Sequence, residues 1–440
     1  MKGYYVKIGL LTIILSLFFM PIFQKTIGLF KEPQLYGHFH KEERPKLNPK
    51  AWFDGSFQDR YDTYIRDNIG FNAFFIRVFN QVNFSLYKTT NTKDVAIGKN
   101  KYLYSINNYE QYFGIDTLRS DLLEWRAIQL ERIAKRLKQE DIDLILVLAP
   151  SKAGFLPDYF PDDFTTKNKD KSSYKTFVNR LKDRDVNCLD LSGWFIENRE
   201  DFKYNIFSNT GVHWSQYGIY LVADSLLRYS EEVLDYNVAK IHLDSVVVST
   251  KLRGQDDDIE RSMNLIFDIK DIEMPYPILS FETSSDGQEP EFLIIGDSYY
   301  WDFYTLDIPE KSFNNAEFWY YFNEVHEEGY GLNKIKDVDK EAFTQEFSKK
   351  DIIVILSNDA NFYYLTRIIS EIYEGYFPNQ IDEEYYEAEF ENRVDNMIMN
   401  IKKTPEWYDN LKQQAIDQNL SLDEVLRSNA IYVINTESND

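Results

Sequence analysis

A serine and its immediate neighbours occupy a position that suits nucleophilic catalysis. Ser298 ends the tripeptide Gly296-Asp297-Ser298, which directly follows the apolar run 292–295. A glycine lets the chain turn sharply off a strand, so that a serine on the turn faces the crevice. Its backbone N–H near a helix N-terminus can then stabilise an oxyanion. The alternative is an ordinary strand-to-helix turn in which Ser298 is only a cap.

A serine nucleophile needs a general base, and the chain offers five histidines. His38 and His40 lie in a polar segment near the N-terminus, His242 in a strand-like stretch, and His326 in an acidic loop or helix. His213 comes just ahead of a helical pattern, where an imidazole is accessible and can face a cleft. We interpret His213 as the base, with capping of that helix as the alternative.

Other reactive residue types give weaker signals. Cys188 is the only cysteine, so no intrachain disulfide forms, and its apolar surroundings indicate a small core residue. The acidic run Asp256-Asp257-Asp258 could bind a cation, but such a surface loop is usually only solvated. The sequence has no metal-ligand spacing, P-loop or GxGxxG motif, so we expect no metal and no cofactor.

The composition limits the class of partner. The 440 residues are 43% hydrophobic and carry a formal net charge of −23. That length and apolar content allow a sizeable packed core. A surface with this much negative charge repels phosphate backbones, which argues against nucleic acid as a partner.

An apolar run near the N-terminus predicts a membrane anchor. Ile8 to Phe23 contains no charged residue, and Lys2 and Lys7 precede it. With the residues before it the run can span roughly 30 Å of hydrocarbon, and the lysines favour a cytoplasmic N-terminus. A cleavable signal peptide is the alternative, but no small-x-small site follows Phe23. We therefore expect a single-pass anchor with the remainder of the chain exported.

The elements that must position Ser298 and His213 alternate between strand-like and helix-like patterns. Apolar residues at helical spacing predict helices over 123–137, 174–181 and 215–229, and apolar runs predict strands at 142–148, 186–191, 292–295 and 352–356. This alternation indicates an α/β layered fold with a mostly parallel sheet, in which chemistry occurs at the carboxyl ends of the strands. We divide the chain into an anchor (1–30), a juxtamembrane linker (31–50), a catalytic domain (51–380) and an acidic helical extension (381–440).

Several motifs, in order, resemble one family. Over roughly residues 50–370 the chain resembles the SGNH-hydrolase-like acetyltransferases that O-acetylate alginate and related exopolysaccharides in bacterial envelopes. The motifs are Phe53-Asp54-Gly55-Ser56-Phe57, Asp67-Asn68-Ile69-Gly70-Phe71, Ile97-Gly98-Lys99-Asn100-Lys101-Tyr102-Leu103-Tyr104, Leu148-Ala149-Pro150-Ser151-Lys152-Ala153, His213-Trp214-Ser215 and Gly296-Asp297-Ser298.

The resemblance implies roles for individual residues. It makes Ser298 the nucleophile and His213 the general base, within an SGNH-hydrolase-like three-layer fold, and gives Asp297 the part of holding its loop. The family commonly has an aspartate two residues before the histidine, but Gly211 stands there. Either another carboxylate or a backbone carbonyl must orient the imidazole. Asn358, after the last predicted strand, is the candidate third oxyanion donor, with simple turn chemistry as its alternative.

The same resemblance implies an activity and partners. It indicates an O-acetyltransferase on the periplasmic side of the inner (cytoplasmic) membrane, which moves acetyl groups onto a polysaccharide. Because acetyl-coenzyme A is cytoplasmic, a multi-pass membrane acyltransferase would supply the acetyl group. Two alternatives are an acetyl esterase, with water as the acceptor, and a non-catalytic glycan-binding scaffold, which Gly211 would favour.

Overall fold

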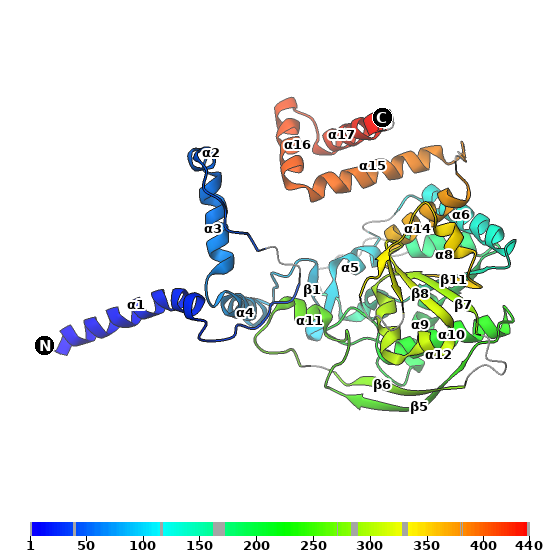
Figure 1. The fold of residues 1–440 in the computed structure, drawn as a ribbon, viewed down its shortest axis with the longest axis horizontal. Coiled ribbons are helices and arrows are strands. Elements are labelled where there is room, and N and C mark those ends of the chain that lie inside the picture. The colour runs from blue at the N-terminus through cyan, green and yellow to red at the C-terminus, as the bar shows by residue number, and fades with distance from the viewer. Residues whose placement is uncertain are drawn as a thin grey trace.

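A seven-stranded sheet forms the centre of the computed structural model (Figure 1), which describes residues 2–37, 41–114, 118–161, 172–270, 272–282, 289–327, 333–378, 380 and 382–437. The strand order is β10-β9-β8-β7-β11-β3-β4. Strands β8, β7, β11, β3 and β4 run parallel, whereas β9 and β10 pair antiparallel at one edge. The bounds are β3 Asp143–Ala149, β4 Asn187–Asp190, β7 Glu291–Gly296, β8 Asn314–Tyr320, β9 Glu324–Glu327, β10 Lys336–Asp337 and β11 Ile352–Asn358.

Helices cover both faces of this sheet, because its central strands are apolar on both faces. Every residue of β3 and β11 is buried. One face packs against α6 (Ser120–Lys138), α8 (Ser173–Leu181) and α14 (Phe362–Tyr376). The other packs against α9 (Leu191–Glu197), α10 (Gln216–Glu232) and α12 (Ile308–Ser312). The predicted three-layer α/β architecture with a mostly parallel sheet is therefore confirmed.

The predicted elements of this core are present within a few residues of their expected ends, and two features differ. His326 lies in strand β9, so its placement in an acidic loop or helix was wrong. A separate antiparallel pair, β5 (Lys240–Ser249) and β6 (Met274–Glu282), was not predicted, although His242 does lie in a strand. Smaller elements complete the body: β1 Val95–Ile97, β2 Leu103–Ser105, α5 Ile106–Tyr112, α7 Lys152–Phe155, α11 Asp258–Met263 and α13 Phe343–Phe347, with single turns η2 Lys99–Lys101, η3 Pro157–Tyr159 and η5 Arg199–Asp201.

The N-terminal helix α1 (Lys2–Ile27) extends away from the body (Figure 1). Its segment Tyr4–Ile27 is long and apolar enough to cross a membrane, and nearly all of it is exposed, with Gln24 buried near its C-terminal end. Three short helices follow and connect α1 to the body: α2 Pro49–Phe53, α3 Ser56–Asn68 and α4 Asn72–Val82, which continues into the turn η1 Asn83–Tyr87. His38 and His40 lie outside the described residues.

The C-terminal helices pack on one another around a small apolar core of their own. They are α15 (Tyr386–Lys403), α16 (Pro405–Gln418) and α17 (Leu422–Glu437). Buried Arg126 of α6 joins them to the body through the Glu389 carboxylate, with Nη2 to Oε2 at 2.9 Å. Residues 386–437 are thus helical apart from short connections, as expected, while the domain boundaries themselves remain predictions.

Candidate active site

Ser298 lies at the carboxyl end of β7, where the sheet meets the helix layer. Asp297 caps the helix that follows, η6 (Ser298–Leu306, a 3₁₀ helix), and its Oδ1 accepts a hydrogen bond from the Tyr299 backbone N–H at 3.0 Å. Gly296 is the last residue of the strand and is buried. The turn leaves Ser298 partly exposed between two fully buried neighbours.

The Asp297 carboxylate also fastens this turn to the neighbouring strand. Its Oδ2 accepts hydrogen bonds from the backbone N–H of Asn358 at 3.2 Å, the Asn358 amide at 2.8 Å and the Asn361 amide at 2.6 Å. Burial raises the pKa of Asp297, and these donors oppose that rise. Asn358 therefore lies beside the serine motif with its amide bonded to Asp297, and its part as an oxyanion donor remains a prediction.

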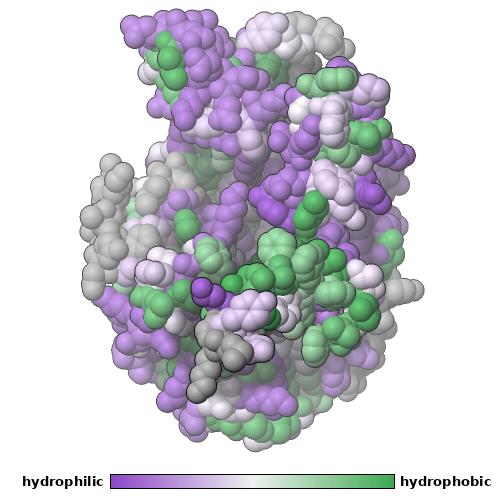
Figure 2. Space-filling view, turned by 90° about the vertical axis from the view of Figure 1, so that its left-hand side faces the viewer, coloured by the Kyte–Doolittle hydropathy of each residue, from purple (hydrophilic) through white to green (hydrophobic). Residues whose placement is uncertain are grey.

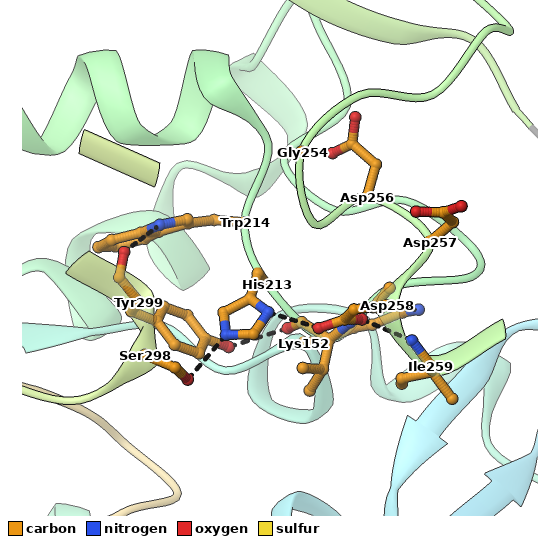
Figure 3. A network of polar contacts seen from close by, with 12 residues as sticks. Lys152, His213, Trp214, Gly254, Asp256, Asp257, Asp258, Ile259, Ser298 and Tyr299 are labelled. Carbon is orange, nitrogen blue, oxygen red and sulfur yellow. Dashed lines mark hydrogen bonds and ion pairs between the residues drawn. The ribbon is translucent and has the colours of Figure 1, made fainter. Parts of the chain in front are cut away.

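His213 lies in the loop that leads into α10. Ser215 caps α10, because its side chain accepts from the Gly218 N–H at 3.2 Å. His213 is thus not the cap, which removes the alternative raised from the sequence. Figure 3 shows the imidazole between Ser298 on one side and Asp258 on the other, only 6% exposed.

The imidazole joins the three side chains into one hydrogen-bonded chain. His213 Nε2 lies 2.8 Å from Ser298 Oγ, and Nδ1 lies 2.6 Å from Asp258 Oδ2. In the tautomer protonated on Nδ1, the ring donates to Asp258 and accepts from the serine hydroxyl. This is the nucleophile–base–acid geometry of serine acyl transfer.

Asp258 is the residue that sequence reasoning missed. The run Asp256-Asp257-Asp258 is not a solvated surface loop: Asp256 is 4% exposed and accepts from the Tyr276 hydroxyl at 2.7 Å. The Asp258 Oδ1 atom accepts the backbone N–H groups of Val212 at 2.8 Å and Ile259 at 2.7 Å. The carboxylate that orients His213 therefore follows it by 45 residues in the sequence.

Gly211 explains how this acid reaches the histidine. A Cβ atom at position 211 would lie 2.6 Å from the Asp256 carbonyl oxygen and 2.7 Å from that of Gln255. The Ser208 hydroxyl bridges the two segments, since it accepts from the Gly211 N–H at 2.7 Å and donates to the Asp256 carbonyl. The absence of a side chain at 211 is what lets the acidic loop come this close.

Tyr299 fixes the distance between the serine turn and the histidine loop. Its hydroxyl donates to the Val212 carbonyl at 3.0 Å, and its own carbonyl accepts from the Trp214 indole N–H at 3.1 Å. Both neighbours of His213 are thus bonded to the residue that follows Ser298 (Figure 3). Because Tyr299 is fully buried, these contacts are shielded from water.

Lys152 donates hydrogen bonds to the backbone of the loop that carries His213. It begins α7 directly after β3, is completely buried, and donates to the carbonyls of Asn209 at 3.0 Å and Gly211 at 2.8 Å. Burial lowers the pKa of Lys152 to about 7, partly opposed by the negative charge of Asp258. Lys152 belongs to the motif Leu148–Ala153, whose place in the site the sequence did not reveal.

The acids around His213 set its electrostatics. Burial disfavours the imidazolium, but the Asp258 carboxylate, with Asp302 and Asp297 beyond it, outweighs burial and raises the pKa of His213 above its ordinary 6.5. Burial also raises the pKa of Asp256 and of Asp302 to about 6. The site therefore favours the protonated ring that forms when His213 takes a proton from serine.

The other residues considered from the sequence lie elsewhere. His242 is exposed and paired with Glu282, and His326 packs edge-on against Trp301. Cys188 is half-buried in β4, and burial raises the pKa of its thiol to about 12, which makes it a poor nucleophile. Within the described part of the chain, no three His, Cys, Asp or Glu side chains are grouped to hold a metal ion.

A cavity of about 420 Å³ lies among residues that follow β3, β4 and β11. Its walls include Tyr112, Tyr174, Arg199 and Asp359, and none of the three catalytic candidates lines it. Asp359, which follows β11, is held by the Ser151 backbone N–H at 3.1 Å and the Ser192 hydroxyl at 2.6 Å. The aromatic and charged walls of this cavity suit a polar ligand at the same edge of the sheet.

Comparison with protein families gives one match. Residues 95–250 match the family model described as an SGNH hydrolase-like domain, acetyltransferase AlgX. The matched stretch contains Lys152, Gly211 and His213 and ends before Asp258 and Ser298. No sequence match to a curated protein was found.

Solved structures with a similar arrangement include the O-acetyltransferase domain of Pseudomonas putida AlgJ, at 15% identity and a TM-score of 0.41 over 64% of this chain and 98% of that one. Pseudomonas aeruginosa AlgX aligns at 16% identity and a TM-score of 0.39, over 62% of this chain and 65% of that one. Bacillus cereus PatB1 aligns at 13% identity and a TM-score of 0.36, over 56% and 92%. These likenesses are remote.

Replacing Gly211 should loosen the site rather than restore a missing acid. We expect Gly211→Ala and Gly211→Asp both to lower the free energy of unfolding by about 1–3 kcal/mol, because the new Cβ overlaps the backbone of residues 255–256. Chemical denaturation measures this. Gly218→Ala is the matched control, since its Cβ meets only ordinary contacts at 3.4 Å. An active, fully stable Gly211→Asp protein would contradict the close approach of the two loops.

Lys152→Met should change how stability depends on pH. The unfolded chain keeps the lysine protonated up to its ordinary pKa of 10.5, whereas the folded chain releases the proton near 7. Between these two pKa values the unfolded state binds more protons than the folded state, so the free energy of unfolding rises with pH across that interval. Below about pH 7 the lysine is protonated in both states, and there the destabilisation caused by burying its charge is greatest and constant. The variant should lack this rise in urea unfolding at a series of pH values.

Lys182→Met provides the control for that series, because Lys182 is exposed. Its stability should track wild type at every pH. Parallel curves for wild type and Lys152→Met would show that Lys152 does not change protonation on folding. The Lys152→Met protein should also react more slowly than wild type, since the carbonyls of Asn209 and Gly211 lose their donor.

Proposed function

The chain carries an SGNH hydrolase-like domain of the acetyltransferase type over residues 95–250, and from that premise we propose that it is a serine-dependent O-acetyltransferase acting on a polysaccharide. The observation that carries the proposal is the hydrogen-bonded chain Ser298–His213–Asp258, with its 2.8 Å and 2.6 Å contacts. Two of these residues lie outside the matched stretch, so the geometry is support independent of the match.

In the first half-reaction the Ser298 hydroxyl attacks the carbonyl carbon of an acetyl donor. His213 Nε2 accepts the serine proton, and Asp258 stabilises the imidazolium through Nδ1. The negative charge that develops on the carbonyl oxygen would be held by the Ser298 backbone N–H and the Asn358 amide. The tetrahedral intermediate then collapses, His213 gives its proton to the leaving group, and acetyl-Ser298 remains.

In the second half-reaction a sugar hydroxyl takes the place of the leaving group. Its oxygen attacks the acetyl carbonyl while His213 removes its proton. The new ester forms as Ser298 Oγ departs and regains a proton from His213. Water in place of the sugar would give an esterase with the same residues, and the family description favours transfer. The non-catalytic scaffold was considered because Gly211 stands where the family commonly has an aspartate. Asp258 offers a carboxylate to His213 in its place, which argues against that alternative.

The helix α1 bears on where the catalytic domain lies and on how its acetyl donor reaches it. An anchor with lysines before it favours a cytoplasmic N-terminus and a domain on the periplasmic side of the inner membrane. A donor made in the cytoplasm must then be carried across, so a multi-pass membrane acyltransferase is the proposed acetyl supplier. The acceptor is a cell-envelope or extracellular polysaccharide, and the proposed chemistry requires no cofactor.

An acyl-enzyme should be trapped on Ser298. We expect wild-type protein, exposed briefly to an activated acetyl ester, to gain one acetyl group by intact mass spectrometry. Peptide mapping should place it on Ser298. Ser298→Ala should gain none, Asp258→Asn should acylate about 10⁴ times more slowly, and His213→Ala about 10⁶ times more slowly, as losses of the corresponding triad members do elsewhere.

Asp257→Asn is the matched control for the acid, because Asp257 is next to Asp258 but pairs with Arg261 at 3.3 Å. It should acylate at the wild-type rate. Unchanged acylation in Asp258→Asn, or an acetyl group that persists in Ser298→Ala, would contradict the assignment. Adding a sugar oligomer then separates the activities, since a transferase yields acetylated sugar and an esterase yields acetate.

The rate of acylation should depend on pH through His213. The base must be neutral to accept the serine proton, and the carboxylates around it raise its pKa above 6.5. We therefore expect kcat/KM for the activated ester to rise with pH through a pKa above 6.5 and then level off. In Asp258→Asn the midpoint should move to lower pH, because the main charge favouring the imidazolium is gone. If the rise of kcat/KM with pH had the same midpoint in Asp258→Asn as in wild type, a group other than His213 would control it.

A further inference from the structure

The helix α4 has its apolar face turned outward. Phe75, Phe79 and Val82 are 51%, 59% and 42% exposed, and Leu86 and Tyr87 of the continuing turn are 70% and 68% exposed. At helical spacing Phe75, Phe79, Val82 and Leu86 lie on one side. A water-facing side with this composition exceeds the scattered apolar residues that are normal on a soluble surface.

The side of the helix that faces the body is held by polar contacts. Asn80 donates to the Met263 carbonyl at 2.8 Å, and Arg77 donates to the Leu265 carbonyl at 2.7 Å. Gln81 accepts the backbone N–H groups of Ile266 at 3.1 Å and Phe267 at 2.9 Å. The usual arrangement of a surface helix, apolar inward and polar outward, is therefore reversed, with only Ala73 and Phe84 buried.

The position of α4 beside α1 indicates what covers its outer face. Gly70, just before α4, is packed so closely that a Cβ there would lie 2.2 Å from the Pro21 carbonyl oxygen and 2.8 Å from Gln24. Glu32, just after α1, accepts the backbone N–H groups of Phe71 at 2.7 Å and Ala73 at 3.2 Å. The N-terminal end of α4 is thus held beside the last turns of the apolar α1 helix, close to where α1 would leave the bilayer.

The charge of the segment that contains α4 also favours contact with a membrane. The chain carries a net charge of −23, yet the stretch from Ile69 to Lys93 has no Asp or Glu and contains Arg77, Lys88 and Lys93. Figure 2 views the molecule from the side toward which α1 extends and shows apolar residues gathered around the middle of that face, among polar residues. Basic, aromatic-rich amphipathic helices lie in the interface of anionic bilayers.

We propose that α4 and the turn η1 lie in the plane of the membrane interface, with Phe75, Phe79, Val82, Leu86 and Tyr87 inserted among the lipids as a second membrane contact beside α1. The inference rests on α1 being the anchor of the proposed function. A peripheral helix next to a spanning helix removes rotation of the body about a single tether. The catalytic body then keeps one orientation relative to the bilayer.

The test measures how deeply spin labels sit in lipid, with the full chain reconstituted in phosphatidylcholine–phosphatidylglycerol vesicles. In a Cys188→Ser background, whose folding is checked by thermal unfolding, a nitroxide is attached at Phe75→Cys, Phe79→Cys, Ile14→Cys or Tyr432→Cys in turn. Tyr432 of α17, 68% exposed, is the aqueous control, and Ile14 of α1, 60% exposed, is the lipid control.

The expected result is a several-fold higher ratio of relaxation by oxygen to relaxation by a water-soluble nickel chelate at Phe75 and Phe79 than at Tyr432. Aqueous values at Phe75 and Phe79 with a lipid value at Ile14 would overturn the inference and leave the anchor intact. An aqueous value at Ile14 would instead overturn the anchor. Protection of Phe79 only after other membrane proteins are added would assign the face to a protein partner and overturn the bilayer contact.

Discussion

The 2.6 Å contact between His213 Nδ1 and Asp258 Oδ2 depends on two loops that meet backbone against backbone. At Gly211 the carbonyl oxygens of residues 255 and 256 occupy the space that any side chain would fill. The Ser208 hydroxyl closes the contact by bonding to both loops. The orientation of the base is therefore set by backbone packing, which cannot relax as a flexible side chain would. An aspartate at position 211 and an acid delivered by the 255–258 loop are mutually exclusive arrangements of the same site.

The serine and the histidine are positioned by different parts of the fold. Asp297 bonds the Ser298 turn to the end of β11 through Asn358 and Asn361. Lys152, the first residue of α7 just after β3, donates hydrogen bonds to two carbonyls of the histidine loop. Each buried charged group thus has several hydrogen-bonding partners, which is what makes its burial tolerable. Tyr299 connects the two parts through both neighbours of His213, so displacing either strand end would change the Nε2–Oγ distance.

Much of this fold could be predicted because its core elements carry their signals locally. Strands β3, β7 and β11 are continuous apolar runs, as strands buried on both faces must be, and α6 shows a clear helical stripe. The short strand β9 has no such run: Val325 and His326 stand between glutamates, so its acidic composition misled the prediction. The β5–β6 pair has many exposed positions and gives an equally weak apolar signal.

The residues of the candidate site likewise divide into those that the sequence predicts and one that it does not. Ser298 and His213 could be found because each stands at the end of a recognisable element, where loops of an α/β sheet converge. Asp258 could not, because nothing local distinguishes it from Asp256 and Asp257. Its role arises from a contact between loops 45 residues apart in sequence. The one clue was the glycine where an aspartate was expected, which marks a missing group without locating its replacement.

The acid of the site and the proposed membrane contact are neighbours in the chain. Asp258 is the first residue of α11, a helix of only six residues, and the segment 263–267, from the last residue of that helix onward, receives the polar contacts of α4. A shift of α4 relative to the body would therefore act on the element that begins at the acid. Because Asp258 also bonds the backbone of Val212, such a shift would reach the histidine loop directly. The proposed contact with the bilayer and the contact that orients His213 are thus joined through one short segment, residues 258–267.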